Sequence, residues 1–295
     1  MDKSIDQSNS GNTYVADPND LKEMARLIQQ DRALRSLTPP IFTDEEWNLF
    51  HRVLDIGCGP GGWVLDMAHL HPHSRFVGID ISEQMLGYAR MLAQAESREN
   101  VEFLNMNATQ PLAFPDASFD YVNGRFLYSF VTPQHWPLLL RECIRILRPN
   151  GRILVADYEA EYSTSTAVER LSAFLTKAGT LTGRSFSETG RSSGLCVVLQ
   201  NLLRDAGFQQ VEMKPYFIEF APQNPGFKNW RDDFLLMSHT FSTFVASAGF
   251  TTQEEIRSLV DQALQDFNDA HFSAISLQVI AWGVKPQTQA TTNAG

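Results

Sequence analysis

The chain has 295 residues, and with 43% hydrophobic and 20% charged residues its composition is that of a globular protein, which excludes a disordered or fibrous chain. Thirty-four acidic against 24 basic residues give a net charge of −10, so the surface as a whole repels phosphates and we expect no nucleic-acid partner. The three cysteines, Cys58, Cys143 and Cys196, are odd in number and widely spaced, which argues against a disulfide framework and against a Cys-rich metal site.

The distribution of apolar residues indicates a protein of the cytoplasm. No charged-then-apolar leader opens the chain, and the most apolar long stretch, residues 234–250, is interrupted by serine, threonine and histidine. We therefore expect reduced cysteines, a cytoplasmic location and no membrane partner.

The N-terminal part, residues 1–49, is predicted to be a helical lid segment that precedes the main domain. Asp17 and Pro18 supply an N-cap and a first-turn proline, and apolar residues then recur at helical spacing up to a Pro-Pro break. These apolar residues are Leu21, Met24, Ala25 and Ile28. At the other end, residues 287–295 are polar and lack periodicity, which predicts a disordered tail.

From residue 50 onward, short β-rich runs alternate with helical stretches. The predicted strands are residues 52–56, 75–79, 101–105, 119–123 and 152–158, with a turn at Arg148–Gly151 before the last of them. Such alternation is typical of a parallel sheet with helices on both faces. We therefore predict one α/β domain over residues 50–286.

This alternation is interrupted by two insertions, residues 161–194 and residues 222–270. Two long β-rich runs, residues 209–220 and 273–284, surround the second insertion and can pair as an antiparallel hairpin at the edge of the sheet. Nine of the 20 phenylalanines lie in or next to the insertions. The insertions are therefore predicted to form an aromatic, helical lid over an apolar pocket for a small molecule.

The most informative motif is VLDIGCGPGG at residues 53–62, where a β-rich run passes through a glycine turn into a helix. Glycines allow a positive φ and a close approach of the backbone to a ligand. Read as G-x-G-x-x-G from Gly57 to Gly62, the loop fits the dinucleotide fingerprint, and Asp80 fits its acidic partner for a ribose diol. The spacing alone therefore leaves the cofactor open.

Three features favour S-adenosylmethionine over a dinucleotide. Asp55, two residues before Gly57, would repel a pyrophosphate, whereas its carboxylate suits the amino and sulfonium cations. Pro60 lacks the N–H that a phosphate cradle would use. The hairpin at the sheet edge is not expected in a two-half dinucleotide fold.

Four segments, in this order along the chain, resemble the class I S-adenosylmethionine-dependent methyltransferases of the small-molecule type: LDIGCGPG, FVGIDIS, NATQPLAFPDASFD and LRPNGRILVADY. The resemblance covers residues 50–160 well and extends more weakly to LLRDAGFQQVEM. It implies a Rossmann-like, mostly parallel sheet of seven strands whose last strand is antiparallel, with S-adenosylmethionine as the cofactor. It also implies methyl transfer to an oxygen, nitrogen or carbon atom of a small acceptor, which the aromatic lid predicts to be largely apolar.

The same resemblance implies which residues meet the cofactor. Those near its methionine part would be Asp55, Gly57, Cys58, Gly59, Gly61, Asn123, Gly124 and Arg125. The residue for the ribose hydroxyls would be Asp80, and those for the adenine would be Ile81, Met85, Asn107 and Ala108. Tyr14, in a segment that resembles the N-terminal lead-in of small-molecule members, would fold over the cofactor.

A hydroxyl or a carbon acid as acceptor would need a base, and three residues near the ends of the predicted strands are candidates. In order of preference they are His135, in the first turn of the helix after the fourth strand, and Tyr158 and Glu159, which follow the fifth strand. The histidines of HLHPHS have no acidic companion, so we predict no metal site. Two alternatives stay open at this point: a non-catalytic scaffold that binds the cofactor, and an NAD(P)-dependent oxidoreductase. The sequence also leaves open whether the chain forms a homodimer.

Overall fold

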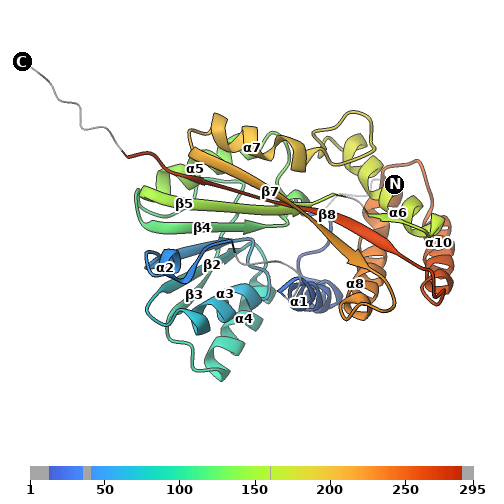
Figure 1. Cartoon of the computed structure of the whole chain (residues 1–295), viewed down its shortest axis with the longest axis horizontal. Helices are drawn as coiled ribbons and strands as arrows, with labels where there is room; N and C mark the ends of the chain where they lie inside the picture. The colour runs from blue at the N-terminus through green and yellow to red at the C-terminus, as the bar shows by residue number, and fades with distance from the viewer. Residues whose placement is uncertain (1–12, 36–40, 160, 288–295) are drawn as a thin grey trace, which may run out of the picture.

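A single twisted sheet organises the molecule (Figure 1). In the computed structural model, which describes residues 13–35, 41–159 and 161–287, eight strands are joined in the order β3-β2-β1-β4-β5-β8, and both β6 and β7 pair with β8. The strands are β1 (Arg52–Ile56), β2 (Arg75–Asp80), β3 (Val101–Asn105), β4 (Phe119–Arg125), β5 (Leu147–Tyr158), β6 (Tyr162–Ser163), β7 (Gln209–Phe220) and β8 (Ala274–Val284). Strands β1 to β5 are mutually parallel, and β8 is antiparallel to its neighbours β5, β6 and β7.

The Rossmann-like fold expected from the sequence is confirmed, with two differences in the sheet. The two-residue strand β6 adds an eighth strand to the predicted seven. Strand β5 begins at Leu147 rather than at Arg152, because the predicted turn is instead an irregularity within the strand where Asn150 takes a φ of +64°. The Asn150 backbone N–H donates to the Lys285 carbonyl at 2.9 Å, which keeps this irregular stretch paired with the sheet edge.

Alternate residues of the strands point to opposite faces of the sheet, and helices cover both faces. On one face, Leu54 and Ile56 of β1 pack beneath α5 (Trp136–Ile146) and α7 (Leu195–Asp205). On the other face, Val53 packs against α3 (Gly62–Leu70) and α4 (Glu83–Ala95). Because each central strand is buried on both sides, the strand ends are held rigidly and can position a binding site.

Residues 41–50 belong to the second of these faces. The short helix α2 (Asp44–Trp47) begins with a capping box from Thr43 and Glu46, and Phe42 and Trp47 pack edge-on against the buried ring of Tyr121 in β4. The domain boundary predicted near residue 50 therefore falls inside this core.

A third core lies beyond the carboxyl ends of the parallel strands, on the side of α1, α8 and α10 in Figure 1. It is built by four helices from the two insertions: α6 (Thr166–Leu181), α8 (Phe227–Thr240), α9 (Ser242–Ser247) and α10 (Gln253–Asp266). Phenylalanines and Trp230 form its centre, where the rings of Phe220 and Trp230 stack with centroids 4.8 Å apart. Helix α1 (Leu21–Arg35) packs alongside α8.

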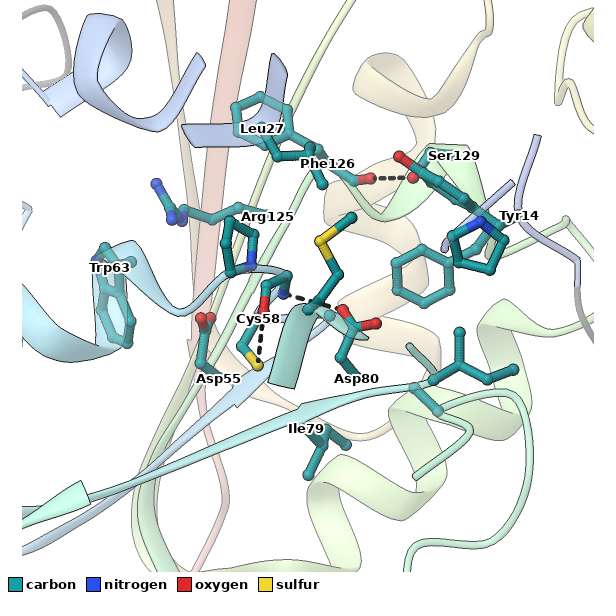
Figure 2. Close-up of a pocket in the computed structure, with 18 of the residues that line it drawn as sticks. Tyr14, Leu27, Asp55, Cys58, Trp63, Ile79, Asp80, Arg125, Phe126 and Ser129 are labelled. Carbon is teal, nitrogen blue, oxygen red and sulfur yellow. Dashed lines mark hydrogen bonds between the residues drawn. The ribbon is translucent and has the colours of Figure 1, made fainter. Parts of the chain in front are cut away.

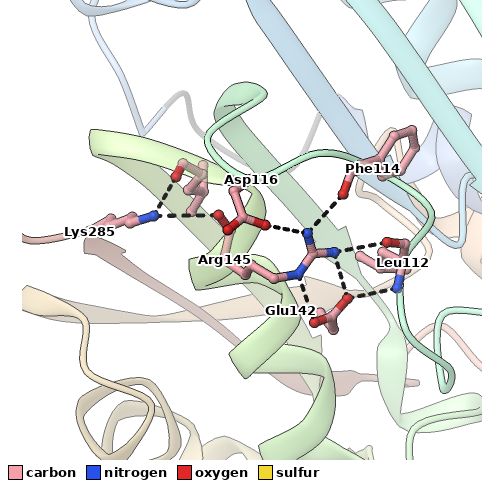
Figure 3. A network of polar contacts seen from close by, with 7 residues as sticks. Leu112, Phe114, Asp116, Glu142, Arg145 and Lys285 are labelled. Atoms are coloured by element: carbon pink, nitrogen blue, oxygen red, sulfur yellow. Dashed lines mark hydrogen bonds and ion pairs between the residues drawn. The ribbon is translucent and has the colours of Figure 1, made fainter.

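The loop that follows β3 is fastened to α5 by one arginine (Figure 3). The Arg145 guanidinium donates to the Glu142 carboxylate at 2.7 and 2.9 Å and to Asp116 at 2.8 Å. It also donates to the carbonyls of Leu112 and Phe114, both at 2.8 Å. Three of these partners, Leu112, Phe114 and Asp116, belong to the loop, so one planar side chain ties the loop to α5 at three points.

In the described part of the chain, no helix has both the length and the apolar character needed to cross a bilayer. Over the same residues, no group of three or more His, Cys, Asp or Glu side chains gathers as metal ligands would.

Candidate cofactor and acceptor site

A cavity of about 1040 Å³ opens at the carboxyl ends of β1, β2 and β4. Strand β1 has β2 on one side and β4 on the other. The strand order therefore reverses at β1, and sheets of this kind have a crevice at such a point. We call this the first cavity. The predicted cofactor residues that line it are Tyr14, Asp55, Gly57, Cys58, Gly59, Asp80, Ile81, Met85, Asn107, Ala108 and Arg125.

The glycine loop brings backbone to the floor of the first cavity. Gly57 and Gly59 have φ angles of +66° and +53°, which side-chain-bearing residues rarely adopt. A Cβ atom on Gly57 would also lie 2.9 Å from the Phe130 ring, so the close packing of this loop depends on glycine. Cys58 is buried, and burial raises the pKa of its thiol, which makes it a packing residue rather than a nucleophile.

Asp80 lies at the end of β2, and Figure 2 shows it on the other side of Cys58 from Asp55. Its carboxylate accepts the N–H groups of Gly59 and Ser82, both at 2.9 Å, so it holds the glycine loop in place. Burial raises its pKa. A carboxylate that lines a cavity and retains lone pairs can accept further hydrogen bonds from hydroxyl groups.

Asp55 is a buried carboxylate that is held by hydrogen-bonded side chains of β4. The Asn123 side-chain amide donates to it at 2.7 Å, and the Tyr121 hydroxyl donates to Asn123 at 3.1 Å. Burial raises the pKa of Asp55 to about 7, and the positive charge of Arg125 opposes that rise. Asn123 therefore lies beneath Asp55 and does not line the first cavity, although the sequence placed it beside the cofactor.

Arg125, at the end of β4, supplies the opposite charge. Its guanidinium donates to Asp31 at 3.1 Å and lies 5.8 Å from the centre of the Trp63 ring. Its Nε atom is buried and has no hydrogen-bond partner among the residues that the structure describes. A buried donor without a partner is costly, and this one belongs to a residue that lines the first cavity. Together, the Asp55 carboxylate and this donor fit the ammonium and carboxylate groups of an α-amino acid moiety.

The far end of the first cavity is apolar. Ile79, Ile81, Met85 and Met106 line it, as do the fixed turn residues Asn107 and Ala108. The Asn107 side-chain oxygen accepts the backbone N–H and the hydroxyl of Thr109, at 2.9 and 2.8 Å, which orders this turn. A flat, apolar slot that ends at an ordered backbone turn fits a purine ring. The whole cavity therefore fits S-adenosylmethionine, with its amino-acid part at one end and its adenine at the other.

The N-terminal segment closes over this cavity. The Thr13 hydroxyl donates to the Phe130 carbonyl at 2.6 Å, and the Val15 N–H donates to the Ser129 carbonyl at 3.1 Å. The Leu27 side chain of α1 reaches to within 3.6 Å of where a Cβ on Gly59 would lie. The segment therefore covers the glycine loop.

Helix α1 turns a polar face inward, which corrects the apolar stripe predicted for it. Leu21 is 62% exposed, whereas Glu23 and Arg26 are buried. The Tyr14 hydroxyl donates to Glu23, and the Arg26 guanidinium donates to both oxygens of Glu23 at 2.7 Å. Arg26 also pairs with Asp233 of α8 at 3.2 Å. This ion-pair network joins α1 to the third core.

Among the cavities under the lid helices, two share lining residues with each other and with the first cavity, and we call these two the lid cavities. The larger, of about 820 Å³, shares residues with the first cavity, among them Tyr14, Leu27 and Phe126. The smaller, of about 580 Å³, shares Tyr158 and Met237 with the larger. The three cavities therefore adjoin one another from the glycine loop to the aromatic centre of the lid.

Of the three candidate bases, only Tyr158 lines the lid cavities. Its ring meets that of Phe126 at 5.6 Å, and its hydroxyl lies 3.7 Å from the sulfur of Met237. Glu159 instead accepts two backbone N–H groups at the start of α7, at 2.8 and 3.3 Å, which fixes that helix end. His135 precedes α5, and its Nδ1 lies 2.8 Å from the Thr132 hydroxyl. Neither Glu159 nor His135 lines any of the three cavities.

Residues 53–151 match a family described as a methyltransferase domain. A demethylmenaquinone methyltransferase from Geobacillus kaustophilus is 31% identical over 189 residues, which span 60% of this chain and 79% of that relative. The chain belongs to the class I S-adenosylmethionine-dependent methyltransferases. Its cofactor is S-adenosylmethionine, and the oxidoreductase and scaffold alternatives are set aside.

Solved structures share the fold of this methyltransferase at low identity. The YcgJ protein from Bacillus subtilis has a TM-score of 0.50 and 19% identity, over 81% of this chain and 94% of that protein. Phosphoethanolamine N-methyltransferase 2 from Haemonchus contortus, solved with S-adenosylhomocysteine and phosphomonomethylethanolamine, has a TM-score of 0.50 and 22% identity, over 88% of this chain and 52% of that protein.

Two more predicted cofactor residues of the methyltransferase lie outside the first cavity, besides Asn123. Gly61 is the N-cap of α3 with a φ of +79°, and a Cβ on it would lie 2.7 Å from Ala89. Gly124 is packed against Leu127, which leaves 2.9 Å for a Cβ. Both glycines therefore serve close packing beside the cavity.

Several lining residues were not found from the sequence. They include Leu27, Gln30, Asp31, Trp63, Phe126, Ser129 and Phe130. The residues of α1 carried one signal that was not used: a helix with charged residues three apart, at Glu23 and Arg26, beside a tyrosine that was itself expected at the cofactor.

Proposed function

We propose that this methyltransferase transfers the methyl group to an oxygen, nitrogen or carbon atom of a small, largely apolar metabolite bound in the lid cavities. The observation that carries the proposal is that the first cavity and the larger lid cavity share lining residues, among them Leu27 and Phe126. The apolar residues Leu175, Met237, Phe241 and Phe244 line the larger lid cavity. An acceptor held there would face the cofactor across Phe126 and Leu27.

The cofactor contacts follow from the geometry of the first cavity. Asp55 and Arg125 would hold the amino-acid part, and Asp80 would accept the ribose hydroxyls. Asn107 and Ala108 would border the adenine. When bound, S-adenosylmethionine supplies a sulfonium methyl group whose carbon–sulfur bond breaks, with the electron pair kept on sulfur, as the bond to the acceptor forms.

The residues of the chain would contribute mainly alignment and the exclusion of water. The N-terminal segment and the lid helices enclose the reacting groups, and such alignment is worth up to ~7–11 kcal/mol of barrier. Tyr158, the candidate base that lines the lid cavities, would contact the acceptor. Burial raises its pKa, so its hydroxyl stays protonated and serves as a hydrogen-bond donor rather than as a base.

Filling the lid cavities tests the proposal. Met237 lines both lid cavities but not the first cavity, so Met237→Trp places a larger side chain in the lid cavities alone. It should abolish release of S-adenosylhomocysteine with a panel of small phenols, amines and carbon acids while leaving cofactor affinity unchanged. The matched control is Leu264→Trp on the exposed face of α10. Parental turnover in a folded Met237→Trp variant would show that the acceptor binds elsewhere.

A further inference from the structure

Two charged side chains of opposite sign line the larger lid cavity, and the protein neutralises neither. One oxygen of Glu161 accepts the Ser172 hydroxyl at 2.7 Å. Arg184 lies 5.6 Å from the centre of the Phe244 ring and donates to the Ser129 carbonyl at 3.5 Å. Within the described residues, no cation pairs with Glu161 and no carboxylate pairs with Arg184.

The other charged residues that line the lid cavities are already satisfied. Arg26 lies between the carboxylates of Glu23 and Asp233, at 2.7 and 3.2 Å. Asp157 accepts two backbone N–H groups, both at 3.0 Å. Among the described residues, Glu161 and Arg184 are therefore the charged lining side chains that have neither an ion-pair partner nor a pair of backbone N–H groups.

These two remaining charges are costly to the protein without a ligand. Burial raises the pKa of Glu161 and lowers that of Arg184, because both side chains have lost hydration without gaining an opposite charge. A structural ion pair would remove this cost, yet the two side chains do not meet. Two opposite charges that line one cavity without pairing are the arrangement expected of a binding site.

We propose that the acceptor is amphoteric, with a cationic group that meets Glu161, an anionic group that meets Arg184, and an apolar body between them. This rests on the proposed function, in which the acceptor occupies the lid cavities. The planar guanidinium of Arg184 suits a carboxylate. Glu161 also lines the smaller lid cavity together with the rings of Tyr158 and Trp230, and aromatic rings favour an ammonium group. The residues available to the body are Leu175, Met237 and Phe241. An amino acid with an apolar side chain has this combination of groups.

Three matched probes distinguish the contributions of the two charges to binding. L-Phenylalanine carries both, phenethylamine lacks the carboxylate, and 3-phenylpropanoate lacks the amine. Titration calorimetry on the full chain saturated with S-adenosylhomocysteine should show phenylalanine binding roughly tenfold or more tightly than either partial probe.

Two charge-neutral variants should respond in opposite ways. Glu161→Gln should weaken binding of the two amines more than that of 3-phenylpropanoate, and Arg184→Met should weaken binding of the two carboxylates more than that of phenethylamine. The matched controls are Glu188→Gln and Arg191→Met, exposed residues of the same α6–α7 loop as Arg184, which should leave all three affinities unchanged.

A second readout needs no acceptor. Because each substitution removes an uncompensated charge, Glu161→Gln and Arg184→Met should keep or raise the melting temperature of the ligand-free protein. A purely structural role for either residue predicts a lower melting temperature instead.

Four results would overturn the amphoteric acceptor: equal affinity for the three probes, no probe bound at millimolar concentration, equal effects of both variants on all probes, or destabilisation by both variants. Methyl transfer to a neutral phenol that both variants leave unchanged would also overturn it, while the proposed function would stand. Turnover that persists in Met237→Trp would instead overturn the proposed function itself.

Discussion

Asp80 ends β2 at the mouth of the glycine loop and lines the first cavity. Two charge-assisted hydrogen bonds to a ribose diol, each about 1.5–3 kcal/mol, predict that Asp80→Ala weakens S-adenosylhomocysteine binding roughly 100-fold. Titration calorimetry measures this, and Asp261→Ala on the exposed face of α10 is the matched control. A folded Asp80→Ala protein with parental affinity would remove Asp80 from the site.

The buried carboxyl of Asp55 predicts a pH dependence of cofactor binding. Burial raises its pKa to about 7, so in the folded protein its contribution to stability is present at low pH and is lost as the pH rises through about 7. An ammonium group favours the ionised form, so S-adenosylhomocysteine should bind about tenfold more tightly at pH 8 than at pH 6.

The Asp55→Asn variant isolates that effect. Burial also raises the pKa of Asp157 to about 7, but Asp157 lines the larger lid cavity and not the first cavity. Asp55→Asn keeps Asp157 and should make the affinity nearly independent of pH over this range. An unchanged slope in the variant would assign the titration to another group.

At the residue scale, the sequence predicted what local pattern determines. The glycine loop and Asp80 lie where the motif placed them, because a strand, a tight turn and a helix leave little choice of geometry. Asn123 was misplaced because it lies two residues before the end of β4, beside its register partner Asp55, so it supports that carboxylate from within the sheet. Glu159 was misplaced because its partners are at the start of α7, more than 30 residues further along the chain.

At the scale of elements, α1 is predicted to respond to the cofactor. Its Leu27 lies over Gly59, and Glu23 and Arg26 tie it to Tyr14 and to α8. Cofactor binding should therefore slow amide hydrogen exchange in residues 13–35.

Hydrogen exchange followed by mass spectrometry measures this response, with α7 as the internal control because none of its residues lines the first cavity. Identical exchange in residues 13–35 with and without S-adenosylhomocysteine would mean that the segment is a passive cover.

The Arg145 network is predicted to stabilise the whole fold through one loop. Arg145→Met removes hydrogen bonds to two carboxylates and two carbonyls, and because Arg145 is 30% exposed the expected loss is about 1–3 kcal/mol in the free energy of unfolding. Urea denaturation measures it. Arg148→Met should cost less, because the Arg148 side chain is more exposed than Arg145 and pairs with one carboxylate, that of Asp120. Equal losses for the two variants would contradict a special role for Arg145.

Elements whose apolar residues recur at regular spacing were predicted well. Elements whose structure depends on contacts with distant residues of the chain were not. Strands β1 to β4 occupy their predicted places, because apolar residues on their buried faces select one structure. Helix α1 was predicted from its apolar spacing, which did not indicate that its buried residues Glu23 and Arg26 pair with Tyr14 and Asp233. The start of β5 depends on Lys285, at the far end of the chain.

At the scale of the whole molecule, the sheet and the lid have different roles. Two cores on the faces of the sheet fix the strand ends, and the third core holds the lid helices over them. The sequence indicated this division through its phenylalanine-rich insertions. It could not indicate that Glu161 and Arg184 line one cavity, because that requires the path of α6 between them.

The most direct test of this account is a crystal structure of the chain with S-adenosylhomocysteine. We expect the amino-acid part of the ligand between Asp55 and Arg125, with Arg125 Nε donating to its carboxylate, the ribose on Asp80 and the adenine beside Asn107. The sulfur would face Phe126 and the lid cavities. A ligand bound outside the first cavity, or one whose sulfur faces away from the lid, would contradict it.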